Sequence, residues 1–412
     1  MNVLIDARLP DSSVGGIQVV IQCLAKGFSE SEIEHNHDFR RFWLVYENTT
    51  WWEKYIPVND NIIKTKFPFG KLGVFLLRRY PKYLSKIRPI YSVIFRFPKY
   101  PFDKLLNEKS IDLVHQPFQD SFRTKFKSIW HPHDLQHVYF PEFFTKSQIK
   151  HRNSYWRKNA EHANLIVCET PLIKNDVINT WDINSKKIEI VPTPPLPRLN
   201  LDSEQNMKLP KRFLYYPAAF WPHKNHFRLI YAFDQLRKEG FDVSLVLTGA
   251  KNGVYKEVVN LTHKLKLEEN IFFLGHVSDD QVVHIFKNCQ IVVIPTLHES
   301  LSLPVWEAWI YGKPLAYSKI DYLPFQVDGT GFGFNPYDID SITATLRDIL
   351  DKKVDLEFAE NRSKEKLMNL TPEYFAKSCF ELYCKVLKYK LEDKDKNALI
   401  KLQQSIGYSD EK

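Results

Sequence analysis

The sequence predicts an α/β protein built on doubly wound parallel sheets. Short apolar runs rich in β-branched residues recur along the chain, and the run at 291–294 (IVVI) suits a buried parallel strand. Segments with apolar residues at helical spacing separate these runs. Such alternation of strand and helix indicates parallel sheets packed against helices. With 412 residues, 44% of them hydrophobic, the chain has material for two or three domains with substantial cores.

Composition and the first residues lead us to expect a cytoplasmic protein. The start MNVLIDARLP carries Asp6 and Arg8 and lacks the apolar core of a signal peptide, so we expect neither a leader nor an anchor. No apolar run is long enough to span a bilayer. The five cysteines are scattered and include no Cys-x-x-Cys pair, which argues against a disulfide framework and against a zinc site.

In the first half of the chain we expect a strand at 2–7, a turn at Gly15 and Gly16, and a helix at 17–28. Further strands are expected at 42–46, 111–115, 128–131 and 164–169. The proline-rich segment 193–197 (TPPLP) is typical of a stiff linker. We therefore place a domain boundary near residue 200.

The second half repeats the alternation. The expected strands are 213–217, 243–248, 270–274, 291–294 and 315–317. The expected helices are 226–239, 255–265, 278–286, a helix that begins at Pro304, 339–350 and 372–389. The tail after residue 390 is charged, and we expect it to fray.

Two acids mark the most informative stretch, which runs from 291 to 314. Glu299 lies in the loop after the strand, and Glu307 lies eight residues later, one turn inside the next helix. Ligands of open α/β sheets bind at this carboxyl edge. The helix start is expected to present unpaired N–H groups of Ser302 and Leu303, which suit a phosphate. A sugar nucleotide combines a phosphate with hydroxyls that carboxylates bind.

The segment HESLSLPVWEAWIYGKP (298–314) resembles the donor-binding signature of the retaining GT-B glycosyltransferases of family four. The resemblance implies two Rossmann-like domains that face each other across a cleft, with a C-terminal helix crossing back to the first domain. It therefore predicts an acceptor domain at 1–200 completed by the helix at 372–390, a donor domain at 201–371 and a charged tail at 391–412. Ser302 departs from the pattern, because the family often has glycine there.

The resemblance also implies roles for the donor-domain residues. Glu299 is expected to bind hydroxyls of the transferred sugar, Glu307 the ribose, and the N–H groups of Ser302 and Leu303 the diphosphate. Lys224 lies beside a helix start in Pro-His-Lys-Asn, where a charged hydrogen bond to the diphosphate is worth roughly 1.5–3 kcal/mol. The family often has an arginine just before this lysine, but here alanines occupy 218 and 219. Either Lys224 acts with less help, or His223 substitutes for that arginine.

Three further positions match the family by place. A glycine loop at Gly15 and Gly16 approaches the donor phosphates or the sugar, and the backbone near Val277 holds the nucleotide base. A His-Asp at the end of an N-domain strand corresponds to His133, whose ring hydrogen-bonds the transferred sugar. The histidines around His133 also allow two other interpretations, a zinc site or helix capping by Asp134.

The sequence thus predicts a retaining, metal-independent glycosyltransferase that needs no cofactor and moves a hexose from a nucleotide-diphosphate sugar, with GDP-mannose as the family-level donor. The expected acceptor is a glycan or a lipid-linked molecule. The alternative is a non-catalytic subunit that binds a sugar nucleotide or a glycan within a glycan-assembly complex. Nothing in the motifs supports a nucleic-acid partner.

Residues 64–102 carry ten basic side chains and no acidic one, interleaved with aromatic residues. This mixture suits the anionic inner face of a membrane, with Arg78, Arg79, Lys82 and Lys86 as the acceptor-side contact. The plain alternative is that the aromatic side chains are core and the basic ones are solvated.

Overall fold

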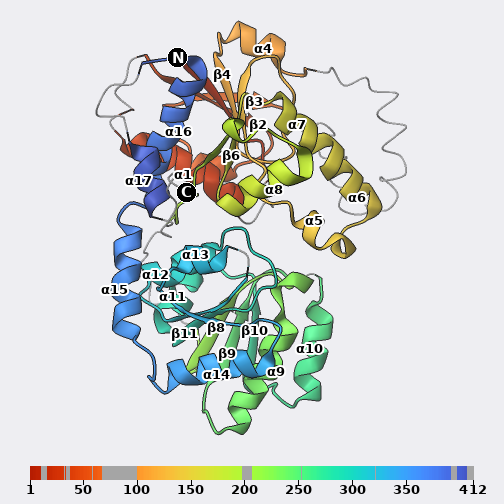
Figure 1. The fold of residues 1–412 in the computed structure, drawn as a ribbon, viewed down its shortest axis with the longest axis vertical. Coiled ribbons are helices and arrows are strands. Elements are labelled where there is room, and N and C mark those ends of the chain that lie inside the picture. Colours follow the sequence, from red (N-terminus) through yellow and green to blue (C-terminus); the bar gives the residue numbers. More distant parts are fainter. Residues whose placement is uncertain are drawn as a thin grey trace. The chain divides into compact units, whose positions relative to one another are not determined.

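The computed structural model describes residues 1–10, 16–31, 33, 38–57, 59–66, 100–196, 207–251, 253–320, 322–390 and 397–405. The chain forms two compact units. The N-terminal unit combines Met1–Thr193 with Pro372–Leu399, and the C-terminal unit combines Pro194–Thr371 with Ile400–Lys412 (Figure 1). None of the described helices is long and apolar enough to cross a membrane.

The N-terminal unit is built on a seven-stranded parallel sheet with the order β3-β2-β1-β4-β5-β6-β7. Its strands are β1 (Asn2–Asp6), β2 (Arg40–Tyr46), β3 (Asn61–Thr65), β4 (Leu113–Gln116), β5 (Lys127–Trp130), β6 (Leu165–Cys168) and β7 (Ile188–Ile190). Its helical segments are α1 (Gly16–Glu30), η2 (Trp51–Lys54), α4 (Asp103–Glu108), α5 (Gln136–Tyr139), η3 (Pro141–Phe143), α6 (Lys146–His151), the π-helical η4 (Arg152–Trp156), α7 (Arg157–His162), α8 (Pro171–Trp181), η5 (Ser185–Lys187) and α16 (Pro372–Leu387).

The C-terminal unit has a six-stranded parallel sheet with the order β10-β9-β8-β11-β12-β13. Its strands are β8 (Phe213–Pro217), β9 (Ser244–Thr248), β10 (Ile271–Gly275), β11 (Ile291–Ile294), β12 (Leu315–Ser318) and β13 (Phe332–Phe334). Its helical segments are η6 (Pro222–Lys224), α9 (His226–Lys238), α10 (Tyr255–Lys264), α11 (Asp279–Asn288), α12 (Leu303–Ile310), α13 (Leu323–Val327), α14 (Ile339–Leu350) and α15 (Leu356–Leu367). The boundary between the units falls inside α17 (Ala398–Gln404), after Leu399.

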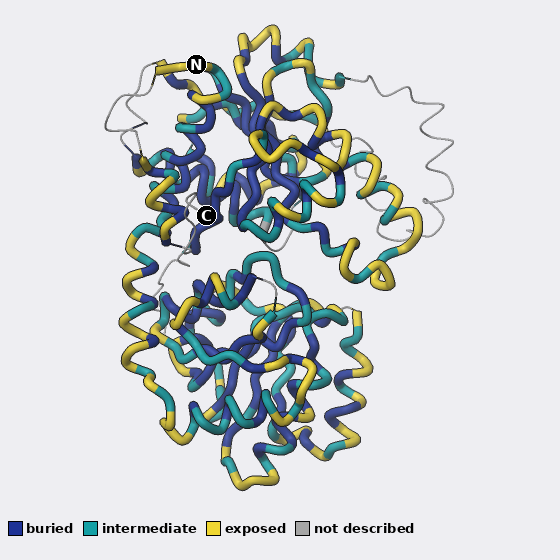
Figure 2. Tube along the Cα trace, viewed as in Figure 1, coloured by how far each residue is buried: buried dark blue, intermediate teal, exposed yellow. Residues whose placement is uncertain are grey.

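Both sheets reverse their winding direction at one point, between β1 and β4 and between β8 and β11. This is the strand order of a dinucleotide-binding fold, in which ligands bind at the carboxyl ends of the strands beside the reversal. The prediction of two doubly wound parallel sheets is confirmed. The central strands of each sheet are buried, and the exposed residues gather on the outer sides of the helices (Figure 2).

The two faces of the C-terminal sheet explain why its strands are apolar at consecutive positions. Leu214 and Tyr216 of β8 pack in the core that α9, α10 and α14 cover. Tyr215, between them, meets Phe286 of α11 edge-to-face with ring centroids 4.9 Å apart. A strand covered by helices on both faces has no solvent side, so it shows no alternation of polar and apolar residues.

The C-terminal helix α16 belongs to the N-terminal unit, as predicted. It packs so tightly on α1 that a Cβ atom at Gly27 would lie 1.9 Å from the carbonyl oxygen of Pro372. Tyr383 of α16 reaches the sheet, where its hydroxyl lies 2.6 Å from Nδ1 of His115. A glycine at position 27 is therefore required by the close approach of the two helices.

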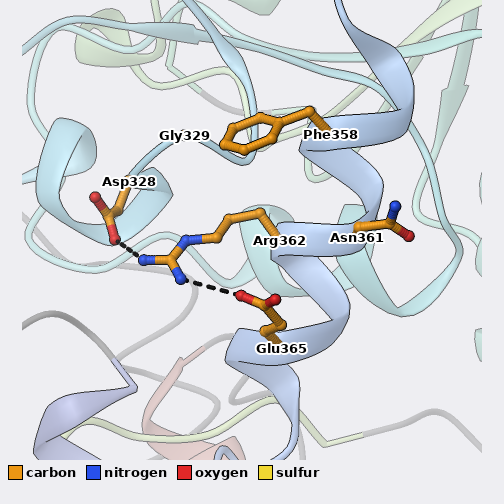
Figure 3. Close-up of a pocket in the computed structure, with 6 residues that line it drawn as sticks. All are labelled: Asp328, Gly329, Phe358, Asn361, Arg362 and Glu365. Carbon is orange, nitrogen blue, oxygen red and sulfur yellow. Dashed lines mark hydrogen bonds and ion pairs between the residues drawn. The ribbon is translucent and has the colours of Figure 1, made fainter.

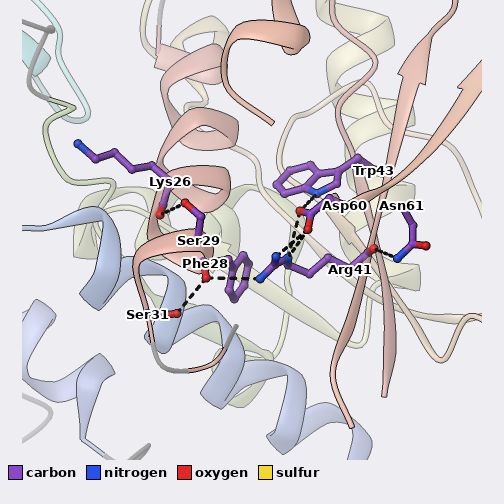
Figure 4. A network of polar contacts seen from close by, with 8 residues as sticks. All are labelled: Lys26, Phe28, Ser29, Ser31, Arg41, Trp43, Asp60 and Asn61. Atoms are coloured by element: carbon purple, nitrogen blue, oxygen red, sulfur yellow. Dashed lines mark hydrogen bonds and ion pairs between the residues drawn. The ribbon is translucent and has the colours of Figure 1, made fainter. Parts of the chain in front are cut away.

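A buried ion pair ties β2 to the segment that leads into β3. Nη2 of Arg41 lies 2.6 Å from Oδ1 of Asp60, and both side chains are less than one tenth exposed. The second oxygen of Asp60 accepts a hydrogen bond from Trp43 Nε1 at 2.6 Å (Figure 4). The carboxylate is thus paired in charge and hydrogen-bonded, which is what allows it to be buried.

Sequence patterns located the central elements better than the edge elements. Strands β8 and β11 and helix α14 have the predicted bounds, and α12 begins at Leu303, one residue before Pro304. The edge strands β3, β7 and β13 were not predicted. β7 and β13 have only three residues each, and β13 contains a glycine between its two phenylalanines. β3 begins with asparagine and has polar residues at three of its five positions, so none of the three shows the continuous apolar pattern of a buried strand.

Candidate donor site in the C-terminal unit

The carboxyl edge at the β8/β11 reversal brings together two of the predicted residues. Lys224 ends η6, which follows β8, and Glu299 lies in the loop that follows β11. Nζ of Lys224 lies 2.6 Å from Oε2 of Glu299, and the two side chains are 20% and 17% exposed. The pair is 75 positions apart in sequence, and it lies where this fold places its ligand.

Backbone hydrogen bonds join the two loops that carry this pair. The Leu297 N–H donates to the carbonyl of His223 at 2.7 Å, and the Thr296 hydroxyl donates to the same oxygen at 3.2 Å. The side-chain amide of buried Asn225 donates to the carbonyls of Pro295 and Pro336, at 2.9 Å each. Asn225 has a φ of 59°, a left-handed conformation that asparagine tolerates well. The loops are therefore fixed against each other before any ligand binds.

His223 is held in its neutral form. Burial, followed by the charge of Lys224 and the neighbouring histidines, lowers the pKa of His223 to about 3. The ring is uncharged at neutral pH, so it does not bring the positive charge of the arginine that the family often has. Substitution of that arginine by His223 stays a prediction, and in this structure the ring that would substitute is neutral.

The start of α12 differs from the prediction in one respect. The N–H of Ser302 is not unpaired, because it donates to Oε1 of Gln326 at 2.9 Å. Leu303 is the first residue of the helix, and Glu307 lies on its second turn, half-buried. The prediction of an open N–H at Ser302 is wrong, and the roles of Leu303 and Glu307 stay predictions.

Val277 lies apart from the reversal point. It follows β10, two strand positions from β8, in the short loop before α11. Gly275 at the end of β10 has a φ of 70°, and its carbonyl accepts a hydrogen bond from Gly249 N–H at 2.8 Å. A role for this backbone in holding a base stays a prediction.

In the N-terminal unit, His133 follows β5 with a left-handed φ of 58°. Its ring is buried, with Nδ1 3.1 Å from Oε1 of Glu169 and Nε2 2.7 Å from the carbonyl of Pro117. Both ring nitrogens have partners within the unit, and the predicted hydrogen bond from His133 to the sugar stays a prediction. Both partners are acceptors, so the arrangement suits a ring with two N–H groups.

The protonation state of His133 follows from that environment. Burial alone would lower the pKa of His133, but the charge and hydrogen bond of Glu169, followed by the Pro117 carbonyl and the charge of Asp134, together raise the pKa. Glu169 also accepts a hydrogen bond from the Thr193 hydroxyl at 2.9 Å. Asp134 accepts from the N–H of Gln136 at 3.1 Å, but the N-cap of α5 is Leu135, so the interpretation of Asp134 as the N-cap is wrong. Among the described residues, no three His, Cys, Asp or Glu side chains are arranged to hold a metal ion.

Several predicted residues lie where the structure gives little or no description. Gly15 and the basic residues Arg78, Arg79, Lys82 and Lys86 lie outside the described residues. Gly16 is the first residue of α1. Sequence reasoning missed Thr296, Glu169 and Gln326. Each binds a residue that is distant in sequence, 73 positions away for Thr296 and His223, 36 for Glu169 and His133, and 24 for Gln326 and Ser302, and no local motif marks them.

The chain is similar in sequence to known glycosyltransferases. Residues 198–366 match the family described as Glycosyl transferases group 1. The O-antigen chain mannosyltransferase B of Escherichia coli is 22% identical over 224 residues, which cover 52% of this chain and 58% of that protein. This chain spans about half the length of the curated relatives it matches.

Solved structures resemble the chain over nearly its whole length. Sucrose-phosphate synthase from Thermosynechococcus elongatus has a TM-score of 0.68 at 16% identity and covers 94% of this chain and 100% of its own. Alr3699/HepE from Anabaena, in complex with UDP and glucose, has a TM-score of 0.61 at 15% identity and covers 92% of this chain and 98% of its own. At these identities the likeness establishes the fold.

Proposed function

We infer that this chain, whose residues 198–366 match the glycosyl transferases group 1 and which has the GT-B fold, is a glycosyltransferase that uses a nucleotide-sugar donor. The observation that carries this proposal is the Lys224–Glu299 pair at the β8/β11 reversal, close in sequence to the start of α12. A lysine and a helix N-terminus suit a diphosphate, and carboxylates suit the hydroxyls of a sugar and a ribose.

The proposed roles follow from the charge that each group carries. Lys224 neutralises the charge that grows on the diphosphate as its bond to the sugar carbon breaks. Glu299 binds hydroxyls of the transferred sugar, and Glu307 binds the ribose. His133 serves the sugar only if its ring exchanges the Pro117 or Glu169 contact for a sugar hydroxyl.

The proposed reaction retains the configuration of the sugar and needs no metal ion or other cofactor. The acceptor oxygen attacks the sugar carbon from the side that the diphosphate leaves, and the acceptor proton passes to a departing phosphate oxygen. Lys224 supplies positive charge at the diphosphate, so activity should survive chelation with EDTA. Loss of activity on chelation that manganese restores would contradict this part of the proposal.

The proposed sugar is a hexose, with mannose favoured because curated relatives are named mannosyltransferases. HepE is named in complex with UDP, so both GDP and UDP sugars belong in the test. Incubation with a panel of sugar nucleotides should reveal slow hydrolysis of one donor without an acceptor. Donor binding with no hydrolysis, and no transfer to any glycan, would favour the non-catalytic subunit instead.

We propose a glycan or a lipid-linked glycan as acceptor, met by a cytoplasmic protein at an anionic membrane surface. In the described part of the N-terminal unit, Val138, Tyr139 and Phe143 of α5 and η3 are 45%, 41% and 36% exposed. The exposed lysines Lys146 and Lys150 of α6 follow directly. Apolar and aromatic side chains beside basic ones suit the headgroup level of such a membrane.

Sedimentation with liposomes tests the membrane proposal. The protein should bind vesicles that contain phosphatidylserine at low salt, release them at high salt, and ignore neutral vesicles. The paired change Val138→Ser and Phe143→Ser should weaken binding, while Phe358→Ser, a more exposed apolar residue of the C-terminal unit, should not. Changing Arg78, Arg79, Lys82 and Lys86 together to Glu should abolish binding, and an unchanged affinity would remove that stretch from the account.

A further inference from the structure

The side-chain amide of Gln326 binds the backbone of Ser302 at two points, its N–H and its carbonyl. Oε1 of Gln326 accepts from the Ser302 N–H at 2.9 Å, and Nε2 donates to the Ser302 carbonyl at 2.8 Å. Gln326 lies on α13, which follows β12, and its side chain is fully buried. Ser302 is itself buried and stands at the N-cap of α12, between Glu299 and Glu307.

This double hydrogen bond satisfies the Ser302 N–H, which has no partner in the helix, and adds a second donor to the Ser302 carbonyl, which also accepts from the Val305 N–H at 3.2 Å. The first N–H groups of a helix lack intrahelical partners. The Ser302 hydroxyl makes no cap for α12, and its oxygen is buried without a hydrogen-bond partner. A buried peptide group that loses its partner costs about 1–3 kcal/mol, so without Gln326 the loop would gain by moving toward water.

Helix α13 is anchored from its other end. Asp328, its left-handed C-cap, is bound through Oδ2 by Arg362 Nη2 and by buried Lys366 Nζ, at 3.0 Å each. Figure 3 shows Arg362 of α15 reaching between Asp328 and Glu365. These residues line a surface hollow of about 430 Å³ together with Gly329, Phe358 and Asn361, and its lining includes neither Lys224 nor Glu299. The hollow is therefore separate from the donor site, and its side chains fix the helix that carries Gln326.

We propose that Gln326 is a positioning residue for donor binding. Its amide locks the Ser302 peptide and so holds Glu299 and the first turn of α12 in the arrangement that receives the nucleoside diphosphate. The proposal rests on the proposed function, because it concerns the same site. It goes beyond that function because it assigns the positioning of Glu299 and of the start of α12 to a residue of α13.

The variant Gln326→Glu provides a switchable test. A protonated glutamic acid keeps both hydrogen bonds, because its carbonyl accepts from the Ser302 N–H and its O–H donates to the Ser302 carbonyl. The carboxylate loses the donor and faces the carbonyl with negative charge. Burial raises the pKa of such a carboxyl group, so the two forms should interchange between pH 5 and pH 8.

The measurement is calorimetric titration of the folded protein with GDP and, separately, UDP at pH 5 and pH 8, expressed as the ratio of variant to parent Kd. We expect a ratio near one at pH 5 and a loss of at least about tenfold at pH 8. Thr330→Val is the matched control, because it removes the buried bond from the Thr330 hydroxyl to the Val327 carbonyl on the same helix without touching Ser302. It should leave the ratio near one at both pH values.

A ratio that does not change with pH, or an equal loss in Thr330→Val, would overturn the proposal and leave Gln326 a purely structural residue. If the parent binds neither nucleotide, the proposed function fails, and hydrogen exchange decides the inference alone. The Ser302 amide should then exchange faster in Gln326→Glu than in the parent at pH 8 but not at pH 5. Equal protection at pH 8 would refute the clamp, and Gln326→Met, which removes both bonds at similar volume, offers the same readout if the glutamate variant does not fold.

Discussion

Replacing Glu299 by glutamine should make the protein bind a nucleoside diphosphate more tightly while it loses turnover. In this structure the Lys224 ammonium is held by Glu299 at 2.6 Å. A diphosphate that binds Lys224 must compete with this carboxylate. Glutamine keeps the shape of the side chain and removes its charge, so Lys224 becomes more available to the diphosphate. Turnover should fall by orders of magnitude, because the sugar loses its proposed carboxylate partner.

The size of the gain follows from the burial of the pair. Solvent-exposed ion pairs contribute about 0–1 kcal/mol, whereas hydrogen bonds to charged groups contribute about 1.5–3 kcal/mol. With side chains 20% and 17% exposed, this pair lies between the two limits, at about 1–2 kcal/mol. Since 1.4 kcal/mol is a factor of ten, the Kd should fall about 5- to 30-fold.

A double-mutant cycle makes the assay specific. Calorimetry with GDP and UDP would be run on the parent, Glu299→Gln, Lys224→Met and the double variant. In the Lys224→Met background, Glu299→Gln should leave the Kd almost unchanged, because the competing pair is already absent. An equal or weaker affinity in the single variant Glu299→Gln would refute the reasoning and show that the carboxylate does not compete with the ligand.

Three further predictions follow from other parts of the structure. Glu307→Ala should weaken binding of the free nucleotide, whereas Glu299→Gln should not, and identical behaviour of the two variants in calorimetry would contradict the assignment of separate roles. Asp60→Asn should lower the free energy of unfolding by about 3–5 kcal/mol, because it leaves the buried Arg41 guanidinium without its charge partner, while Glu30→Gln in the exposed Lys26–Glu30 pair should change it by less than about 0.5 kcal/mol. Urea denaturation measures the free energy of unfolding of both variants. A similar decrease in both would show that the buried Arg41–Asp60 pair stabilises the protein no more than the exposed Lys26–Glu30 pair does. Burial, followed by the charge of Lys224, lowers the pKa of His226 from 6.5 to about 3. As the pH falls from about 6.5 toward 3, His226 therefore takes up a proton in the unfolded chain but stays neutral in the folded protein. Stability is thus lost with falling pH in that window, and His226→Phe should remove about 2 kcal/mol of the loss between pH 7 and pH 5; denaturation curves with the same pH slope in variant and parent would contradict this.

The central strands were predictable because their pattern is local. β8 and β11 are covered by helices on both faces, so each is a continuous apolar run that can be recognised without knowing its neighbours. The edge strand β7 has only three residues, and each of them pairs with a residue of β6 that lies 22 positions earlier. Whether so short a segment forms a strand depends more on the strand that it pairs with than on its own residues.

In the candidate site, too, features that depend on nearby residues could be predicted, and contacts between distant residues could not. The spacing of Glu299 and Glu307 on a loop and the next helix, and the place of Lys224 at a helix start, could be predicted because each depends on residues within one strand-helix unit. The contact between Lys224 and Glu299 depends on the pairing of β8 with β11. This contact joins two residues that are 75 positions apart. The neutral state of His223 depends on burial, which no short motif records.

What the sequence alone determined is therefore the fold class, the order of its central elements and the kinds of residue at the carboxyl edge of the second sheet. Only the tertiary structure decided which of their polar groups remain open to a ligand. Ser302 shows the reason: its N–H was expected to be unpaired because helices leave their first donors unsatisfied, but Gln326, 24 residues later, folds onto it. Hydrogen-bonding groups in a buried loop take whatever partner the fold brings near, and that partner is chosen by packing over long sequence distances.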